Sequence, residues 1–91
     1  MNVRVKWYHG CSEGDWKKIC DEGILFGERG TPSRCTYLAC QKKDAEKYGD
    51  VLLEVFYNPS INPNMNNYCS DMDIWQIRVY EPILICNVKR L

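Results

Sequence analysis

The chain has 91 residues, 45% of them hydrophobic, which is enough for one domain with a single small core. Twelve basic and twelve acidic residues give a formal net charge of zero, so the overall charge does not indicate nucleic-acid binding, although it leaves room for a local basic patch. The chain contains no run of about 18 apolar residues, so we expect neither a transmembrane helix nor a membrane partner.

The six cysteines and the N-terminal segment bear on the cellular compartment. The cysteines form no Cys-x-x-Cys pair, and the single histidine does not complete a zinc-finger spacing. Residues 1–6 contain no long apolar segment and no small-residue cleavage site of the kind found in secretion signals. We therefore expect a cytoplasmic protein without a metal site, whose cysteines are reduced and mostly structural.

The first predicted element is a strand that leads to a histidine and a glycine. Residues 3–8 alternate apolar and basic side chains before an aromatic pair, as a half-buried strand does. We expect His9 and Gly10 to end this strand. Since glycine lets the backbone come close to a ligand, the end of the strand has the character of a pocket.

A helix is predicted directly after this strand. Ser12 and Asp15 have the spacing of a capping box at a helix N-terminus. Gly23 has the character of the residue that ends a helix. The pattern therefore predicts a helix over residues 13–22, with Trp16 on the side that packs into the core.

The middle of the chain alternates short elements with loops. Residues 24–26 form a short apolar run, and residues 27–33, with two glycines and a proline, have the composition of an exposed loop. Residues 35–39 fit a second short strand. Residues 41–48 have helical character, and Gly49 is placed to end that helix.

The last third of the chain is rich in strand-forming residues. Residues 51–57 form a nearly continuous apolar run, which suits a central strand covered on both faces. Residues 58–67 contain two prolines and five asparagines, so we expect a long loop there. Residues 74–80 and 83–88 fit two further strands, which Pro82 separates.

The order of these elements indicates the fold class. Strand, helix, strand and helix are followed by three strands, and this order favours the α+β class over a doubly wound parallel sheet. We therefore predict one α+β domain over residues 1–91, with a mainly antiparallel sheet of about five strands and two short helices.

Two sets of residues offer chemistry beyond packing. At Tyr8-His9-Gly10, two distinct ring nitrogens stand beside an unhindered backbone, which can present one donor and one acceptor to an amide. Tyr37 and Tyr48 are eleven residues apart, at the expected ends of a strand and a helix, so their rings can act as walls for a flat ligand. From the residues alone, a histidine at the edge of a core and two core tyrosines explain the same pattern.

With these motifs, which span most of the chain, the sequence resembles a very small member of the ADP-ribosyltransferase superfamily. This superfamily includes the poly-ADP-ribose polymerases, the diphtheria-type toxins and the rifamycin ADP-ribosyltransferases. The resemblance implies an ADP-ribosyltransferase-like fold with a split antiparallel sheet. It also implies a mono-ADP-ribosyltransferase that uses NAD as donor substrate, needs no metal, and acts on a protein or small-molecule acceptor.

The resemblance also implies roles for individual residues. In the superfamily, a strand-ending histidine forms hydrogen bonds with the ribose hydroxyls of NAD, and the backbone of the next glycine forms hydrogen bonds with the nicotinamide amide. The resemblance implies these roles for His9 and Gly10, with Cys11 beside them in the binding site. Tyr37 and Tyr48 are similar to the two tyrosines that enclose the nicotinamide ring. The implied catalytic and binding residues thus come from three separate segments of the chain.

Two superfamily positions hold different residues in this chain. Ala45 stands where many relatives have a serine that bonds the nicotinamide amide, which implies a weaker or different hold on that group. Gln76 stands where the polymerases and toxins have a catalytic glutamate, and it completes the implied catalytic set with His9 and Tyr37. In other registers, or at the loop acid of the rifamycin enzymes, the position falls on Arg78, Asn64, Asp71 or Asp73.

The missing glutamate keeps several hypotheses open. Gln76 can bond a ribose hydroxyl, but it cannot balance a developing positive charge as an anion does. The chain is therefore either a transferase or a catalytically inactive module that binds NAD, ADP-ribose or a related nucleotide. An RNA 2′-phosphotransferase, which uses the same fold and several basic cleft residues, and a small domain without a ligand are the remaining alternatives. The basic residues available to the RNA enzyme are Arg4, Arg29, Arg34 and Arg78.

Overall fold

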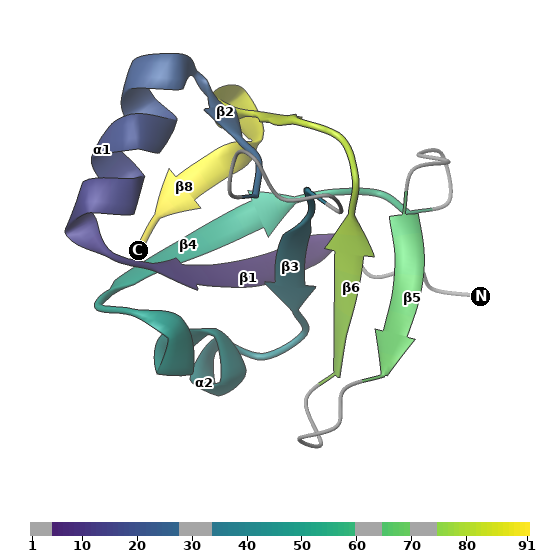
Figure 1. Ribbon diagram of the computed structural model, residues 1–91. Helices are drawn as coiled ribbons and strands as arrows, with labels where there is room; N and C mark the ends of the chain where they lie inside the picture. The colour runs from purple at the N-terminus through teal and green to yellow at the C-terminus, as the bar shows by residue number, and fades with distance from the viewer. Residues whose placement is uncertain (1–4, 28–33, 60–64, 70–74) are drawn as a thin grey trace.

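The computed structural model describes residues 5–27, 34–59, 65–69 and 75–91 (Figure 1). The described elements are the strands β1 to β8, the helices α1 and α2, and the 3-10 turns η1 and η2. In chain order they are β1 (Lys6–Cys11), α1 (Glu13–Glu22), β2 (Ile24–Leu25), β3 (Thr36–Ala39), α2 (Lys42–Ala45), η1 (Glu46–Tyr48), β4 (Val51–Phe56), β5 (Met65–Cys69), β6 (Trp75–Val79), β7 (Ile83–Leu84), η2 (Ile85–Asn87) and β8 (Val88–Arg90).

The strands form one large sheet and one small one. The large sheet has six strands in the order β5-β6-β3-β1-β4-β8, and β2 pairs with β7 in a separate two-stranded sheet. Each of these pairings is antiparallel. The predicted α+β class with a mainly antiparallel sheet and two short helices is therefore confirmed. The large sheet exceeds the expected five strands because β5 and β8 extend its two edges.

The large sheet is split between β1 and β3. Strand β1 pairs with β4 along its whole length, from Lys6 opposite Phe56 to Cys11 opposite Val51. Its register with β3 consists of the single pair Tyr8 and Ala39. Figure 1 shows the consequence: β3, β6 and β5 run across the direction of β1 and β4 instead of continuing beside them.

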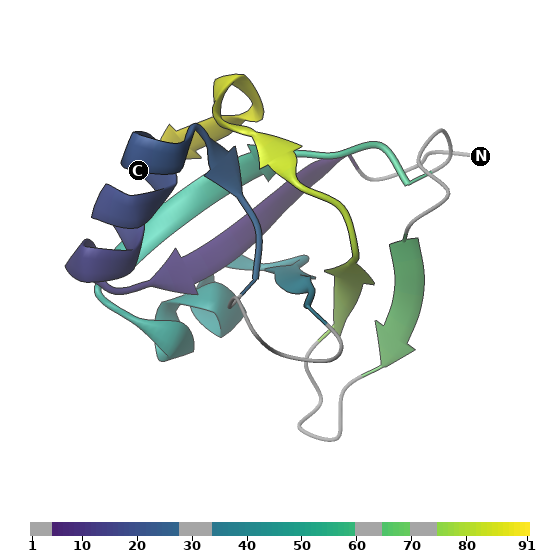
Figure 2. The same ribbon diagram turned by 45° about the horizontal axis from the view of Figure 1, so that its top comes forward.

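The helices cover opposite faces of β1. Ile19 of α1 packs in the same buried cluster as Trp7 and Cys11, which point to one face of the strand. On the other face, Gly10 lies against the backbone of Ala45 in α2. Figure 2 shows α1 with the β2–β7 pair on one side of β1 and β4, and α2 on the other. None of the helices in the described part of the chain is long and apolar enough to cross a membrane.

The prediction for α1 is confirmed at both ends. The helix covers Glu13–Glu22, and the Ser12 hydroxyl accepts a hydrogen bond from the backbone N–H of Asp15 at 3.1 Å. Gly23 ends the helix in the left-handed conformation, with φ of 75°, and its N–H donates to the carbonyl of Ile19. Both signals act within the helix, which is why the sequence pattern was sufficient.

The first strand was predicted too early in the chain. It covers Lys6–Cys11, so His9 and Gly10 lie inside the strand and do not end it. The physical reason is the partner strand, because β4 continues the pairing through Val51 opposite Cys11. A cross-strand partner of this kind leaves no trace in the alternation of residues within β1 itself.

Three predictions in the last third are also corrected. Residues 58–67 were expected to be a loop, yet Met65 begins β5 because β6 supplies a partner there, while residues 60–64 lie outside the described part. Residues 83–88 are two short strands joined by η2, since β7 pairs with β2 and β8 pairs with β4. Strand β4 buries only one face: Val51, Leu53 and Val55 are inside, while the alternate residues are partly or fully exposed.

Candidate functional site

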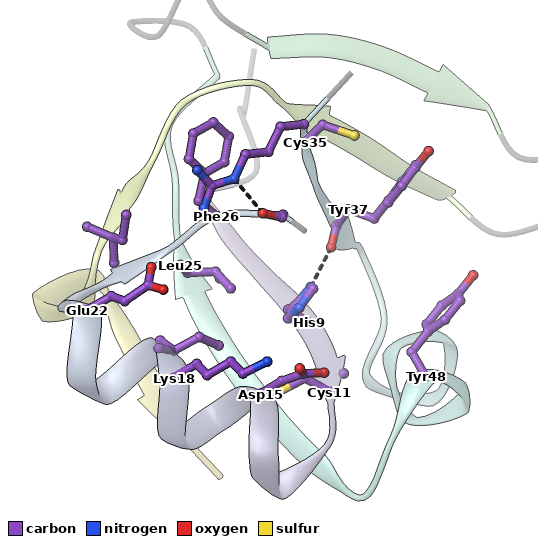
Figure 3. A pocket seen from close by; sticks show the side chains of 15 residues that line it. His9, Cys11, Asp15, Lys18, Glu22, Leu25, Phe26, Cys35, Tyr37 and Tyr48 are labelled. Carbon is purple, nitrogen blue, oxygen red and sulfur yellow. Dashed lines mark hydrogen bonds between the residues drawn. The ribbon is translucent and has the colours of Figure 1, made fainter. Parts of the chain in front are cut away.

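A cleft of about 900 Å³ opens where β1 and β3 diverge. One wall is α1, the opposite wall is the segment that follows β2 together with β3, and the floor is β1 (Figure 3). The η1 turn closes one end. The polar and aromatic side chains that line the cleft belong to His9, Asp15, Lys18, Glu22, Phe26, Arg34, Tyr37 and Tyr48.

His9 is tied to β3 through its side chain. Its Nδ1 lies 2.8 Å from the backbone carbonyl oxygen of Tyr37, and Figure 3 shows this bond inside the cleft. Because a carbonyl oxygen only accepts, Nδ1 carries the proton and donates it. In the neutral ring Nε2 is then an acceptor, which can receive a hydrogen bond from a ligand hydroxyl.

The surroundings of His9 keep its ring neutral. Burial lowers the pKa of His9 below its ordinary value of 6.5, although the hydrogen bond to Tyr37 and the negative charge of Asp15 both act to raise it. Because burial is the largest of the three effects, the ring carries no proton on Nε2 at neutral pH. In the folded protein Nε2 is therefore a hydrogen-bond acceptor.

The two edges of β1 are occupied in different ways. The backbone N–H of Tyr57 donates to the Val5 carbonyl at 2.9 Å, so the odd-numbered residues along β1 direct their backbone groups toward β4. The even-numbered residues Tyr8 and Gly10 then direct their N–H and C=O groups to the other edge, toward β3. Gly10 thus presents one donor and one acceptor on the side where the sheet splits.

A hydrogen bond from the His9 side chain stands where the next backbone pair between β1 and β3 would form. Tyr8 pairs with Ala39, and a continued register would place Tyr37 opposite Gly10. The strands diverge before that point, and the Tyr37 carbonyl accepts from the imidazole of His9 instead. The described ladder between β1 and β3 therefore leaves the backbone N–H and C=O of Gly10 facing the opening between the two strands.

Gly10 also has a packing role that the sequence did not reveal. A Cβ on this residue would lie 1.8 Å from the carbonyl oxygen of Ala45, and 3.3 Å from the Cβ of Tyr48. The close approach that glycine permits on this side is therefore made by α2, not by a ligand. Ala45 itself is 1% exposed and is not among the residues that line the cleft.

Tyr37 and Tyr48 lie at the mouth of the cleft. Their side chains are 44% and 50% exposed, and Figure 3 shows both rings on the η1 side, pointing the same way. Tyr37 comes from β3 and Tyr48 from η1, so the eleven-residue spacing does bring them to one opening. Exposed phenol rings at an opening offer apolar faces to a flat ligand.

Cys11 lies in the floor of the cleft, next to Gly10. It is 4% exposed, and burial raises the pKa of its thiol to about 11, with a further contribution from the negative charge of Asp15. The protonated thiol is a weak nucleophile at neutral pH. Cys11 therefore fits the wall of a binding site better than a reactive position.

The predicted position of the catalytic acid lies apart from the cleft. Gln76 of β6 is buried at 7% exposure, stands opposite Ala39 in the sheet, and is not among the cleft residues. Arg78 stands opposite Tyr37 and is also absent from the lining. Asn64, Asp71 and Asp73 lie outside the described residues.

Three acidic or basic residues of α1 line the cleft and were not expected there from the sequence, whereas Arg34 was considered only for the RNA 2′-phosphotransferase alternative. Asp15, Lys18 and Glu22 lie three and four residues apart, which places them on one face of α1, and all three line the cleft. Arg34 faces them from the opposite wall. The helical spacing was visible in the sequence, but a charged helix face usually faces solvent, and only the position of α1 beside β1 places it in a cleft.

The structure also bears on disulfides and metal sites in the described part of the chain. Five cysteines are free thiols in the structure: Cys11, Cys20, Cys35, Cys40 and Cys86. No group of three or more His, Cys, Asp or Glu side chains that could hold a metal ion is found among the described residues.

Comparison with models of known protein families, with curated proteins and with solved structures gives no match to this chain. The function of the cleft must therefore be inferred from its own geometry and chemistry.

Proposed function

We propose that the cleft binds NAD and that the protein is a mono-ADP-ribosyltransferase with NAD as donor substrate. The observation that carries this proposal is the split of the sheet at Gly10. Its backbone donor and acceptor point toward β3, and the imidazole of His9 donates to the Tyr37 carbonyl that would otherwise accept from the Gly10 N–H. A primary amide such as that of nicotinamide needs one donor and one acceptor side by side.

Two further features of the cleft support a nicotinamide riboside. Nε2 of the neutral His9 ring is an acceptor, and a ribose hydroxyl is a donor of matching chemistry. The exposed rings of Tyr37 and Tyr48 offer apolar surface to the nicotinamide ring at the mouth. Cys11 would form part of the floor below the ligand.

The proposed reaction breaks the bond between ribose C1′ and the nicotinamide nitrogen. Nicotinamide leaves with the bonding electron pair, and a nucleophile of the acceptor forms a new bond to C1′ and loses its proton. Gln76 and Ala45 are outside the lining, so His9, Gly10 and the two tyrosines position the donor. Catalysis would then rest on positioning more than on an anion placed at the reacting sugar. The role of Gln76 in orienting the ribose stays a prediction.

A second candidate is a module that binds NAD, ADP-ribose or a related nucleotide without turnover. The burial of Gln76 favours it, because Gln76 and Arg78, the described candidates for the superfamily's acid position, do not line the cleft. An RNA 2′-phosphotransferase has weaker support, since Arg34 is the one candidate arginine among the described residues that lines the cleft.

We also propose that the protein acts in the cytoplasm. Cys20 and Cys86 are exposed and not paired in a disulfide. Exposed thiols persist in reducing compartments and are oxidised in most others. A protein or small-molecule acceptor from the same compartment would complete the reaction.

Calorimetric titration with NAD, together with measurement of nicotinamide release, tests the proposal. We expect the wild type to bind NAD and to release nicotinamide slowly. Tyr48→Ala should weaken binding by about tenfold, the loss of one aromatic contact of roughly 1.5 kcal/mol. Phe56→Ala is the matched control, because Phe56 is also exposed, at 48%, but lies outside the cleft lining.

The two candidates predict different outcomes. Binding with nicotinamide release supports the transferase, and binding with release at background supports the inactive module. If Gln76→Glu then raises the release rate, the position does reach the ribose. No binding of NAD or ADP-ribose by the wild type would contradict both candidates.

A further inference from the structure

The end of the cleft opposite Tyr48 holds an arginine in a fixed orientation. The Cζ of Arg34 lies 4.1 Å from the centre of the Phe26 ring, and its Nε donates to the backbone carbonyl of Gly27 at 2.6 Å. Figure 3 shows Phe26 and this hydrogen bond far from Tyr48, across the length of the cleft. The guanidinium is therefore held by a stacking contact on its face and a hydrogen bond on one edge.

These two contacts leave part of the guanidinium available to a ligand. A guanidinium has five N–H donors, and the bond to Gly27 uses the one on Nε. The two terminal amino groups form the fork that matches the oxygens of a phosphate. Since Phe26 and Gly27 already restrict the rotamers of Arg34, little further freedom is lost when an anion binds.

The positive charge of Arg34 is not neutralised by a carboxylate of the described residues. Among the residues that the structure describes, no ion pair joins Arg34 to a carboxylate, although Asp15 and Glu22 line the same cleft. Figure 3 shows Asp15 next to Cys11, toward the His9 end, and Glu22 nearer to Phe26. A half-buried cation without a described partner gains most from an anionic ligand, because burial strengthens the attraction between charges.

We infer that Arg34 binds a phosphate of the nucleotide, so that the ligand lies along the cleft with its flat ring at Tyr48 and its phosphate at the Phe26–Arg34 pair. This inference rests on the proposed function and adds a direction and a specificity to it. The cleft would then select phosphorylated nucleosides, and an unphosphorylated nucleoside would occupy only the tyrosine end.

Nicotinamide mononucleotide and nicotinamide riboside test this inference, since they differ only by the phosphate. Calorimetric titration of the wild type should give a dissociation constant for the mononucleotide that is about 10- to 100-fold lower, the range expected for charge-assisted hydrogen bonds. Arg34→Gln should remove this ratio by weakening the mononucleotide alone. Arg34→Lys, which keeps the charge but loses the fork, should keep only part of the advantage.

A cation from the other wall serves as the control. Lys18→Gln removes a positive charge from α1 in the same cleft and should change both dissociation constants by less than about threefold, as expected for an exposed lysine. Unchanged binding of nicotinamide riboside by Arg34→Gln shows that this variant is folded and that the tyrosine end is intact. The charge-retaining Arg34→Lys provides the same check with a smaller perturbation.

The outcomes separate the inference from the proposed function. If the wild type binds neither ligand, the proposed function fails and the inference falls with it. If it binds both with equal affinity, or if Arg34→Gln weakens both equally, the nucleotide site stands but Arg34 is not its phosphate ligand. If Lys18→Gln removes the ratio and Arg34→Gln does not, the phosphate lies against α1 and the inference is overturned.

Discussion

The two edges of β1 differ in how completely they pair with their neighbouring strands. Along the edge toward β4, six consecutive residues pair in register. Along the edge toward β3, the register stops after one pair, and the carbonyl of Tyr37 accepts a hydrogen bond from the ring of His9. The fully paired edge uses its backbone groups for the fold, whereas the split edge leaves those of Gly10 facing the opening where we propose that the nicotinamide amide binds.

The largest expected effect comes from filling the space at Gly10. A Cβ would lie 1.8 Å from the Ala45 carbonyl oxygen, so Gly10→Ala must push α2 away from β1. We expect a loss of about 3 kcal/mol in the free energy of unfolding, the upper range for overpacking, measured by urea denaturation. This change should also distort the split edge and abolish NAD binding.

Gly14→Ala is the control for this change. Gly14 lies in α1, and the nearest atom to a Cβ added there would be the Ser12 hydroxyl oxygen at 3.8 Å. The same substitution should therefore stabilise the protein by up to about 1 kcal/mol, because alanine favours a helix. Equal losses at the two glycines would show that the contact with α2 is not what requires glycine at position 10.

A smaller effect on stability is expected from replacing His9, whose ring connects β1 to β3 where the two strands diverge. His9→Leu leaves the Tyr37 carbonyl without its donor and should cost about 1 to 3 kcal/mol of unfolding free energy. His9→Asn places an amide N–H near the position of Nδ1, so it should retain more of this stability. Both variants lack Nε2 and should bind NAD more weakly than the wild type.

This pair of variants separates the two roles of His9. If the asparagine variant is as unstable as the leucine variant, the bond to Tyr37 does not support the split edge. If the asparagine variant binds NAD like the wild type, Nε2 does not contact the ligand. Thermal unfolding and calorimetry on the same samples give both answers.

The smallest effect is a dependence of stability on pH. The pKa of His9 in the folded protein is below its ordinary value of 6.5, with burial as the main cause. Between these two values the unfolded chain binds a proton that the folded chain does not, so the contribution of His9 to stability falls as the pH decreases below about 6.5. It is fully present above that pH.

Acid unfolding curves of wild type and His9→Asn measure this contribution. The variant should show a smaller decrease in stability between about pH 6.5 and 5, because its side chain does not titrate. NAD binding by the wild type should weaken only at lower pH, below the pKa of His9 in the folded protein, since a protonated Nε2 donates and no longer accepts. Parallel curves for the two proteins would contradict the lowered pKa of His9.

The local elements of this protein could be predicted from its sequence. Ser12 and Gly23 set the bounds of α1, because a capping hydroxyl and a left-handed glycine act within one turn of the helix. The spacing of Tyr37 and Tyr48, with His9 before them, predicted one shared cleft, and the structure brings these three residues together there. The α+β class followed from the order of the elements.

Only the tertiary structure decided how β1 and the cleft are built. The pairing of Cys11 with Val51 placed His9 inside the strand. The close contact with the Ala45 backbone means that packing, too, requires a glycine at position 10. The packing of α1 and the stacking on Phe26 brought charged residues into the cleft, while Gln76 stayed outside it. These contacts join residues far apart in the chain, whereas capping and periodicity act over a few residues, so the sequence determined the elements and the packing determined the site.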